Sequence, residues 1–180
     1  MRLKFAIHFT FSALACLSLQ AQAGRKPDAP ANTESTYIPV HRFDPARDAA
    51  TDIEQAIAEA QRNGKRVLID LGGDWCHWCH ALIQLFQQHP DLLKLREDNF
   101  IMVAVYYGSE NKNERVLSHY AKVVGIPHFF VLEKDGTLLQ SQRVVEFQTD
   151  GNYSPDRVKE FLIKWSPATG YATEANSGKN

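Results

Sequence analysis

Short apolar runs and segments of helical periodicity alternate along the middle of this 180-residue chain. An apolar run bounded by charges and glycines is typical of a buried strand, whereas apolar residues three and four apart indicate an amphipathic helix. We expect helices at residues 49–60, 79–86, 116–124 and 155–165, and strands at residues 67–71, 100–106, 128–132 and 138–147. Strands separated by helices favour a parallel core, and the Asp135-Gly136 turn adds an antiparallel hairpin. The pattern predicts an α/β sandwich with a mixed sheet of about four strands.

The N-terminal segment has the features of an export signal. Two positive charges precede Phe5 to Leu19, a mostly apolar stretch too short for a comfortable membrane span. Ala21-Gln22-Ala23 then matches a small-x-small cleavage site. We interpret residues 1–23 as a signal peptide, with an uncleaved anchor or lipidation of Cys16 as alternatives. The mature protein is expected in the periplasm or another exported location, without stable membrane insertion.

The flanks of the predicted domain are polar and rich in small residues. We assign residues 24–44 to a leader or linker, residues 45–165 to one domain, and residues 166–180 to a flexible tail. The chain has a formal net charge of −1 and no basic run, which argues against a nucleic-acid partner.

Cys76-His77-Trp78-Cys79 lies where a predicted strand ends and a helix begins. A thiolate at Cys76 is favoured there by the free N–H groups and the dipole of the helix N-terminus. Cys79 falls on the apolar stripe of the helix, so we expect it to be buried and less reactive. An exposed thiolate attacks a disulfide, and a buried neighbour then resolves the mixed disulfide. The pair therefore predicts transient mixed disulfides with client or redox-partner proteins.

The residues around this pair resemble those of the thioredoxin family. Asp70 stands six residues before Cys76, Trp75 immediately precedes it, and Gly125-Ile126-Pro127 is similar to that family's proline loop. The resemblance covers residues 47–165 and implies a three-layer, thioredoxin-like sandwich without a cofactor. It also implies that Asp70 accepts a proton from Cys79, and that Pro127 is cis and packs against the disulfide.

Two residues depart from the family pattern. Thioredoxins have Gly-Pro between their cysteines, whereas this chain has His77-Trp78. An imidazolium at His77 stabilises the reduced pair and favours an oxidant, whereas Asp70 is typical of reductant-like members. Both directions of exchange stay open on these residues. We assign partner binding and tuning to four residues: Trp75, His77, Trp78 and Ile126. The plainer alternatives are a solvated Asp70, a solvated His77 and a trans Pro127.

Two other functions match the same segment. Cys76-x-x-Cys79-His80 is the attachment pattern of c-type haem, but Met102, the one methionine besides Met1, falls within a predicted strand. The Cys/His cluster offers zinc or copper ligands, although a helix directs His77 away from the other three. We assign no metal or cofactor and keep both functions as alternatives. The other histidines share no spacing, and only His128, after Pro127, is expected at the edge of the site.

Overall fold

The central sheet of the computed structural model has four strands in the order β2-β1-β3-β4. These strands are β1 (Arg66–Gly72), β2 (Phe100–Tyr106), β3 (His128–Leu132) and β4 (Leu138–Arg143). β1 pairs with β2 in parallel, whereas β3 is antiparallel to both β1 and β4. The structure describes residues 37–167, so the predicted signal peptide (residues 1–23) and most of the predicted tail lie outside the described residues.

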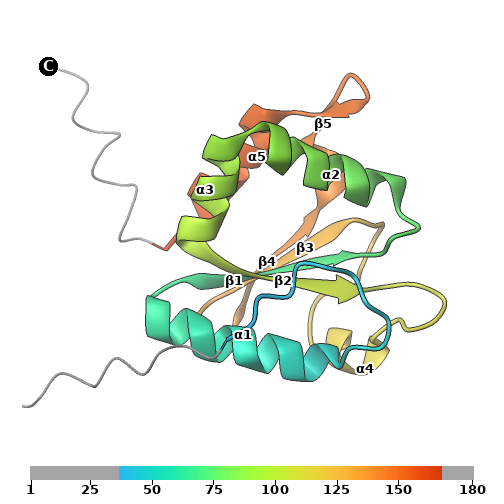
Figure 1. The fold of residues 1–180 in the computed structure, drawn as a ribbon, viewed down its shortest axis with the longest axis vertical. Coiled ribbons are helices and arrows are strands. Elements are labelled where there is room, and N and C mark those ends of the chain that lie inside the picture. The colour runs from blue at the N-terminus through green and yellow to red at the C-terminus, as the bar shows by residue number, and fades with distance from the viewer. Residues whose placement is uncertain (1–36, 168–180) are drawn as a thin grey trace, which may run out of the picture. The chain divides into compact units, whose positions relative to one another are not determined.

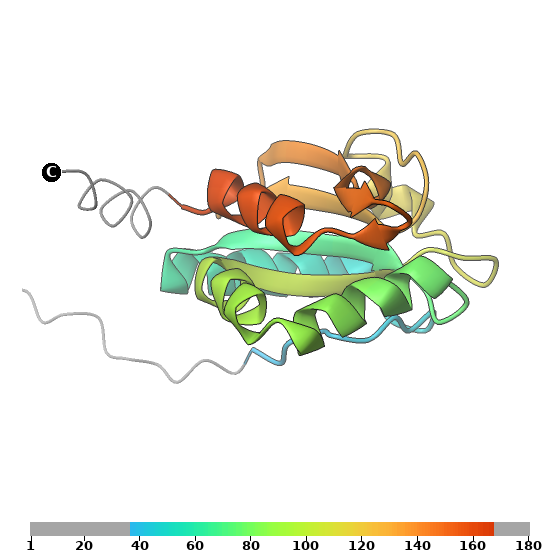
Figure 2. The same cartoon turned by 90° about the horizontal axis from the view of Figure 1, so that it is seen from above.

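Helices cover both faces of the sheet, which confirms the predicted three-layer α/β sandwich (Figures 1 and 2). One face carries α1 (Ala49–Asn63) and the short α4 (Glu114–Leu117). The other face carries α2 (His77–Gln88), α3 (Pro90–Asn99) and α5 (Pro155–Trp165). None of the helices within residues 37–167 is long and apolar enough to cross a membrane.

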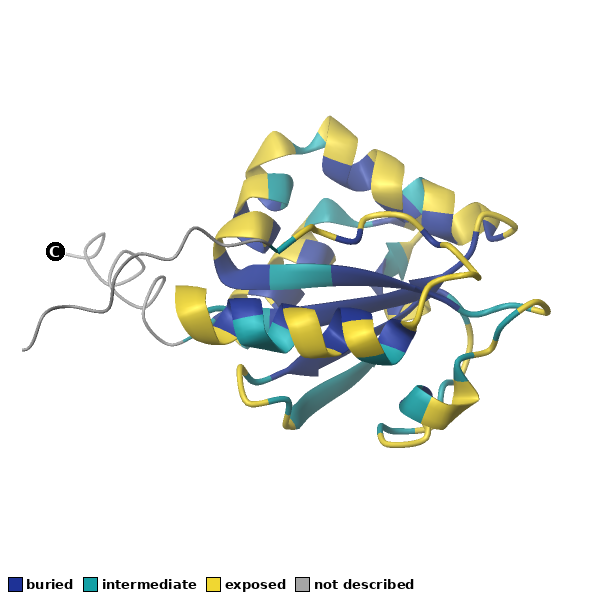
Figure 3. Ribbon diagram, turned by 60° about the horizontal axis from the view of Figure 1, so that its bottom comes forward, coloured by how far each residue is buried: buried dark blue, intermediate teal, exposed yellow. Residues whose placement is uncertain are grey.

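Residues of β1 alternate between these two layers. Val67, Ile69 and Leu71 pack in the cluster that includes α1, whereas Leu68 packs in the cluster of α2, α3 and α5. In Figure 3, β1, β3 and most of β2 are buried, whereas the edge strand β4 is only partly buried. Because side chains two apart share a face of a strand, Asp70 lies on the α2 side of the sheet.

The helix boundaries follow local capping rules. The Asp48 side chain accepts a hydrogen bond from the Ala50 N–H at the start of α1, and Gly64, with φ of 66°, ends that helix. Ser154 caps α5, and Pro155 occupies its first turn, as the sequence predicts.

Three elements differ from the prediction. The helix α3 was not predicted, because charged residues interrupt its apolar pattern and only two of its leucines, Leu92 and Leu95, are buried. The expected helix at residues 116–124 is the four-residue α4, after which the chain is irregular and leaves Val124 51% exposed.

The expected strand at residues 138–147 ends at Arg143. A 3₁₀ turn, η1 (Val144–Phe147), follows and inserts Val144 and Phe147 into the core against α5. The two-residue strands β5 (Gln148–Thr149) and β6 (Asn152–Tyr153) then form a hairpin before α5.

Residues 37–43, here called the N-terminal strap, extend the sheet beyond β2. The Val40 carbonyl accepts the Ala104 N–H at 2.8 Å, and Val40 pairs in parallel with Val103. Val40 and Phe43 are both buried. The assignment of residues 24–44 to a leader is therefore wrong for the strap, whose two buried residues had no periodic pattern around them to reveal their packing.

Candidate active site

The two cysteines form a disulfide at the start of α2, with their Cα atoms 5.2 Å apart. Cys76 is the N-cap residue, so it precedes the first helical turn as expected. The Cys79 N–H donates a hydrogen bond to the Cys76 Sγ at 3.1 Å. This donor and the helix dipole stabilise negative charge on the Cys76 sulfur when the pair is reduced.

Both cysteines are largely covered, Cys76 being 5% and Cys79 2% exposed. The expectation of an exposed Cys76 is therefore wrong for the disulfide form, in which the sulfur packs with Phe43, Ala104 and Tyr106. Cys79 lies on the buried face of α2 with Leu82 and Phe86, as the sequence predicts. Ile83 does not belong to that face, because it is 37% exposed, and Leu85 is buried instead.

Asp70 is buried on the face of β1 that faces the disulfide. Gly72, two residues further along the same face, lies so near the pair that an added Cβ would be 2.8 Å from the Cys79 Sγ. The Asp70 Oδ1 has no hydrogen-bond partner. Burial raises the pKa of the Asp70 carboxyl from 3.8 to about 7, and the positive charge of Arg96 partly offsets that rise. A carboxyl with this pKa exchanges protons readily near neutral pH.

Arg96 is the buried cation of this region, and sequence reasoning missed it together with α3. Its side chain stacks on Phe86, with the guanidinium carbon 4.5 Å from the ring centroid. Its Nε has no hydrogen-bond partner. Burial lowers the pKa of the Arg96 guanidinium, whereas the charges of Glu97 and Asp70 raise it.

The proline loop reaches the same end of the sheet. The Ile126–Pro127 peptide bond is cis. His128 pairs with Leu71 in an antiparallel register, so Pro127, one residue earlier, lies opposite Gly72. A Cβ on Gly72 would be 2.8 Å from the Cys79 Sγ, which places the proline loop beside the disulfide. Ile126 packs against the cluster that contains Cys76 and Cys79.

The three residues between and before the cysteines are exposed. Trp75 is 58% and Trp78 36% exposed, and the His77 ring makes an edge contact with Trp78 at 5.4 Å between centroids. Trp75 lies over two glycines, since its Nε1 would be 2.3 Å from a Cβ on Gly73 and 2.8 Å from one on Gly108.

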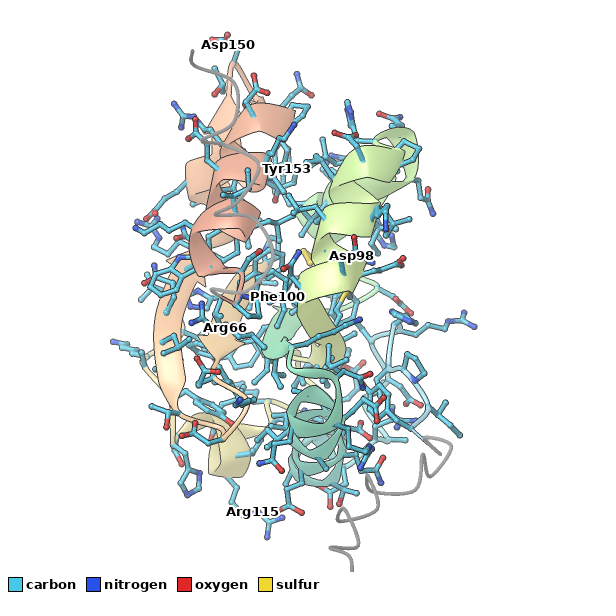
Figure 4. The ribbon with its side chains drawn as sticks, turned by 90° about the vertical axis from the view of Figure 1, so that its left-hand side faces the viewer. Arg66, Asp98, Phe100, Arg115, Asp150 and Tyr153 are labelled. Atoms are coloured by element: carbon cyan, nitrogen blue, oxygen red, sulfur yellow. A yellow bond between two sulfur atoms is a disulfide. The ribbon has the colours of Figure 1, made fainter. Side chains whose placement is uncertain are left out.

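Two tyrosines also reach this region, and the sequence offered no signal for either. Tyr106, at the end of β2, packs with the two cysteines and donates a hydrogen bond to Glu110. Tyr153, on β6, makes an edge contact with Trp78 at 5.7 Å between centroids. Figure 4 shows Tyr153 in the space between α5 and the helices α2 and α3. Burial raises the pKa of Tyr153 to about 12.

Comparison with known proteins identifies the fold family. Residues 48–134 match the family model described as thioredoxin-like. Over these residues the chain is similar to the thioredoxin-like family. The structure titled as a disulphide isomerase from Xylella fastidiosa Temecula1 superposes with a TM-score of 0.60 at 24% identity, covering 71% of this chain and 98% of that one.

Two curated relatives share the thioredoxin-like segment. The thioredoxin-like protein HCF164, chloroplastic, from Oryza sativa subsp. japonica is 34% identical over 92 residues, which are 48% of this chain and 30% of the relative. The thiol:disulfide interchange protein DsbD from Salmonella typhi is 24% identical over 120 residues, covering 67% of this chain and 21% of the relative. The chain thus spans less than a third of either relative.

The histidines of this thioredoxin-like domain do not converge with the cysteines. His77 is exposed, and the His80 Nε2 lies 2.8 Å from the Asp74 carbonyl. Within residues 37–167, no group of three or more histidine, cysteine or acidic side chains is arranged to hold a metal ion. His128 is buried with Phe130 on the α1 side of β3, so it lies on the sheet face opposite Asp70.

Proposed function

We propose that this chain is a thiol–disulfide oxidoreductase that exchanges disulfides with other proteins through Cys76 and Cys79. The observation that carries the proposal is the disulfide at the N-terminus of α2, with a hydrogen-bond donor on the Cys76 sulfur. Asp70, with a pKa of about 7 on the strand beneath, supplies the proton acceptor that such exchange requires.

The exchange proceeds by two displacements at sulfur. The Cys76 thiolate attacks one sulfur of a client disulfide, forming a mixed disulfide and releasing the other client sulfur as a thiolate. Cys79 then gives its proton to Asp70 and attacks the Cys76 sulfur, which releases the second client thiolate. Two electrons pass from the Cys76–Cys79 dithiol to the client, and the reverse sequence oxidises a client dithiol. The relative reduction potentials of pair and client set the direction.

The residues around the pair take supporting roles in this proposal. The exposed rings of Trp75 and Trp78, together with Ile126, offer apolar contact to a client chain beside the disulfide. Pro127 shapes the loop opposite Gly72, and His77 tunes the stability of the Cys76 thiolate. Export through the segment at residues 1–23 places the pair in a compartment where disulfides form, and a mature N-terminus at Gly24 by mass spectrometry tests that step.

Trapping of mixed disulfides tests the two thiol roles. In Cys79→Ala, the client stays attached to Cys76, so we expect covalent adducts that dithiothreitol releases. In Cys76→Ala, the remaining thiol lies within the helix without the N-terminal position that favours a thiolate at Cys76, and we expect no adducts. Equal trapping by both variants, or trapping by Cys76→Ala alone, would contradict the assignment.

A further inference from the structure

The N-terminal strap contributes an aromatic ring to the cluster around the redox pair. Phe43 is 7% exposed and packs with Cys76, Cys79 and two residues of β2, Ala104 and Tyr106. This ring comes from outside residues 48–134, the segment that matches the thioredoxin-like family. Part of the apolar cover over the disulfide therefore comes from the strap, which lies outside the residues that match the family model.

Phe43 and Cys79 meet at the same point of the sheet. A Cβ added to Gly72 would lie 2.5 Å from the Phe43 Cζ and 2.8 Å from the Cys79 Sγ. The ring edge and the sulfur therefore share the space above a residue that has no side chain. Any larger residue at this position of β1 would displace one of them.

Hydrogen bonds to β2 hold the strap along the edge of that strand. The Tyr37 hydroxyl donates to the Met102 carbonyl at 3.4 Å, and Val40 pairs with Val103. Two cavities of about 380 and 270 Å³ border the strap, and His41 and Met102 line both. Phe43 is the strap residue that packs in the cluster of Cys76 and Cys79.

We propose that Phe43 is a positioning residue of the redox pair, whose ring covers the Cys79 sulfur and excludes water from it. The inference rests on the proposed function for the role of Cys79 as the resolving thiol. Because an apolar cover disfavours a thiolate, Cys79 keeps its proton until Asp70 accepts it. The strap thereby confines the attacking role to Cys76.

Phe43→Ala removes no ionisable group from the elements packed around the pair. They are Asp70 on β1, Tyr106 on β2, Arg96 on α3 and Tyr153 on β6. The two histidines that adjoin the cysteines on α2, His77 and His80, are both exposed. A change in Cys79 reactivity in Phe43→Ala therefore reports the cover itself.

Alkylation of Cys79 by iodoacetamide tests the proposal on the reduced, full-length Cys76→Ala protein. Peptide mass spectrometry follows the reaction at Cys79 between pH 6 and 10. Adding Phe43→Ala should raise the rate at pH 7 by about tenfold and lower the midpoint of the pH profile by about one unit. Adding Phe43→Leu, which keeps an apolar cover, should leave both near the values of the parent.

A second core truncation separates the cover from general loosening. Leu117→Ala removes buried carbon on the α1 side of the sheet, away from the pair, and should leave Cys79 alkylation unchanged. An unchanged rate in Phe43→Ala, or an equal rise in Leu117→Ala, would overturn the proposal. The readout needs no client protein, so a failure of trapping with a positive alkylation result would count against the proposed function alone.

Discussion

At the scale of single residues, the proposed exchange depends on a buried carboxyl that is costly to keep charged. Burial raises the pKa of Asp70 to about 7, so it is largely ionised at pH 8 and ready to accept the Cys79 proton. We expect Asp70→Asn to slow resolution of the mixed disulfide by about 100-fold at pH 8, since general bases contribute at least that much. The wild-type rate should show an inflection near pH 7, whereas the rate of the variant should follow the ionisation of the Cys79 thiol alone, without that inflection.

Rapid-mixing kinetics with a disulfide peptide measures that step apart from attack by Cys76. Asp74→Asn is the matched control, because Asp74 is an exposed carboxylate two residues before Cys76. A control that slows resolution as much as Asp70→Asn would show a general effect of negative charge, and the role of Asp70 would be wrong.

At the scale of elements, the site is the junction where β1 passes into α2, with the strap packed against it. Gly72→Ala places a methyl group within 3 Å of both Phe43 and Cys79, so we expect a loss of about 1–3 kcal/mol in the free energy of unfolding. The loss should be smaller when Phe43→Ala is already present, because one of the two clashes is then absent. Urea denaturation of the four proteins measures this coupling, and strict additivity would contradict the shared contact.

The elements around this junction differ in how far the sequence predicts them. The pairs β1–β2 and β3–β4 and the start of α2 follow from apolar runs and turn residues, which are local signals. The strap, α3 and η1 do not, because isolated buried residues such as Phe43, Arg96 and Phe147 gain their environment only from distant segments. The sequence therefore predicts Cys76, Cys79 and Asp70, but it misses the ring and the cation that surround them.

At the scale of the whole molecule, two buried groups give opposite pH dependences of stability. Asp70 holds its proton in the folded state up to about pH 7, so its contribution to stability falls as pH rises from about 4 to 7. Burial lowers the pKa of His128 to about 4, so its contribution is lost as pH falls from 6.5 to 4. The two effects largely cancel between pH 4 and 6.5.

Substitution of either Asp70 or His128 should leave the pH dependence of stability that the other residue causes. Asp70→Asn should make the oxidised protein more stable as pH rises from 4 to 6.5, by on the order of 2–3 kcal/mol. His128→Gln should instead lose stability as pH rises through the same range. Urea denaturation at several pH values measures the free energy of unfolding of both variants. If it changed with pH in the same direction in both, the opposite contributions of Asp70 and His128 would be contradicted.

The central claim is that the Cys76–Cys79 disulfide serves exchange and not structure. Its most direct test is the reduction potential, obtained by equilibrating the protein with glutathione buffers and trapping the thiols with acid. We predict a reversible two-electron transition above about −300 mV, the level below which structural disulfides typically lie. A pair that stays oxidised down to that potential would contradict the account.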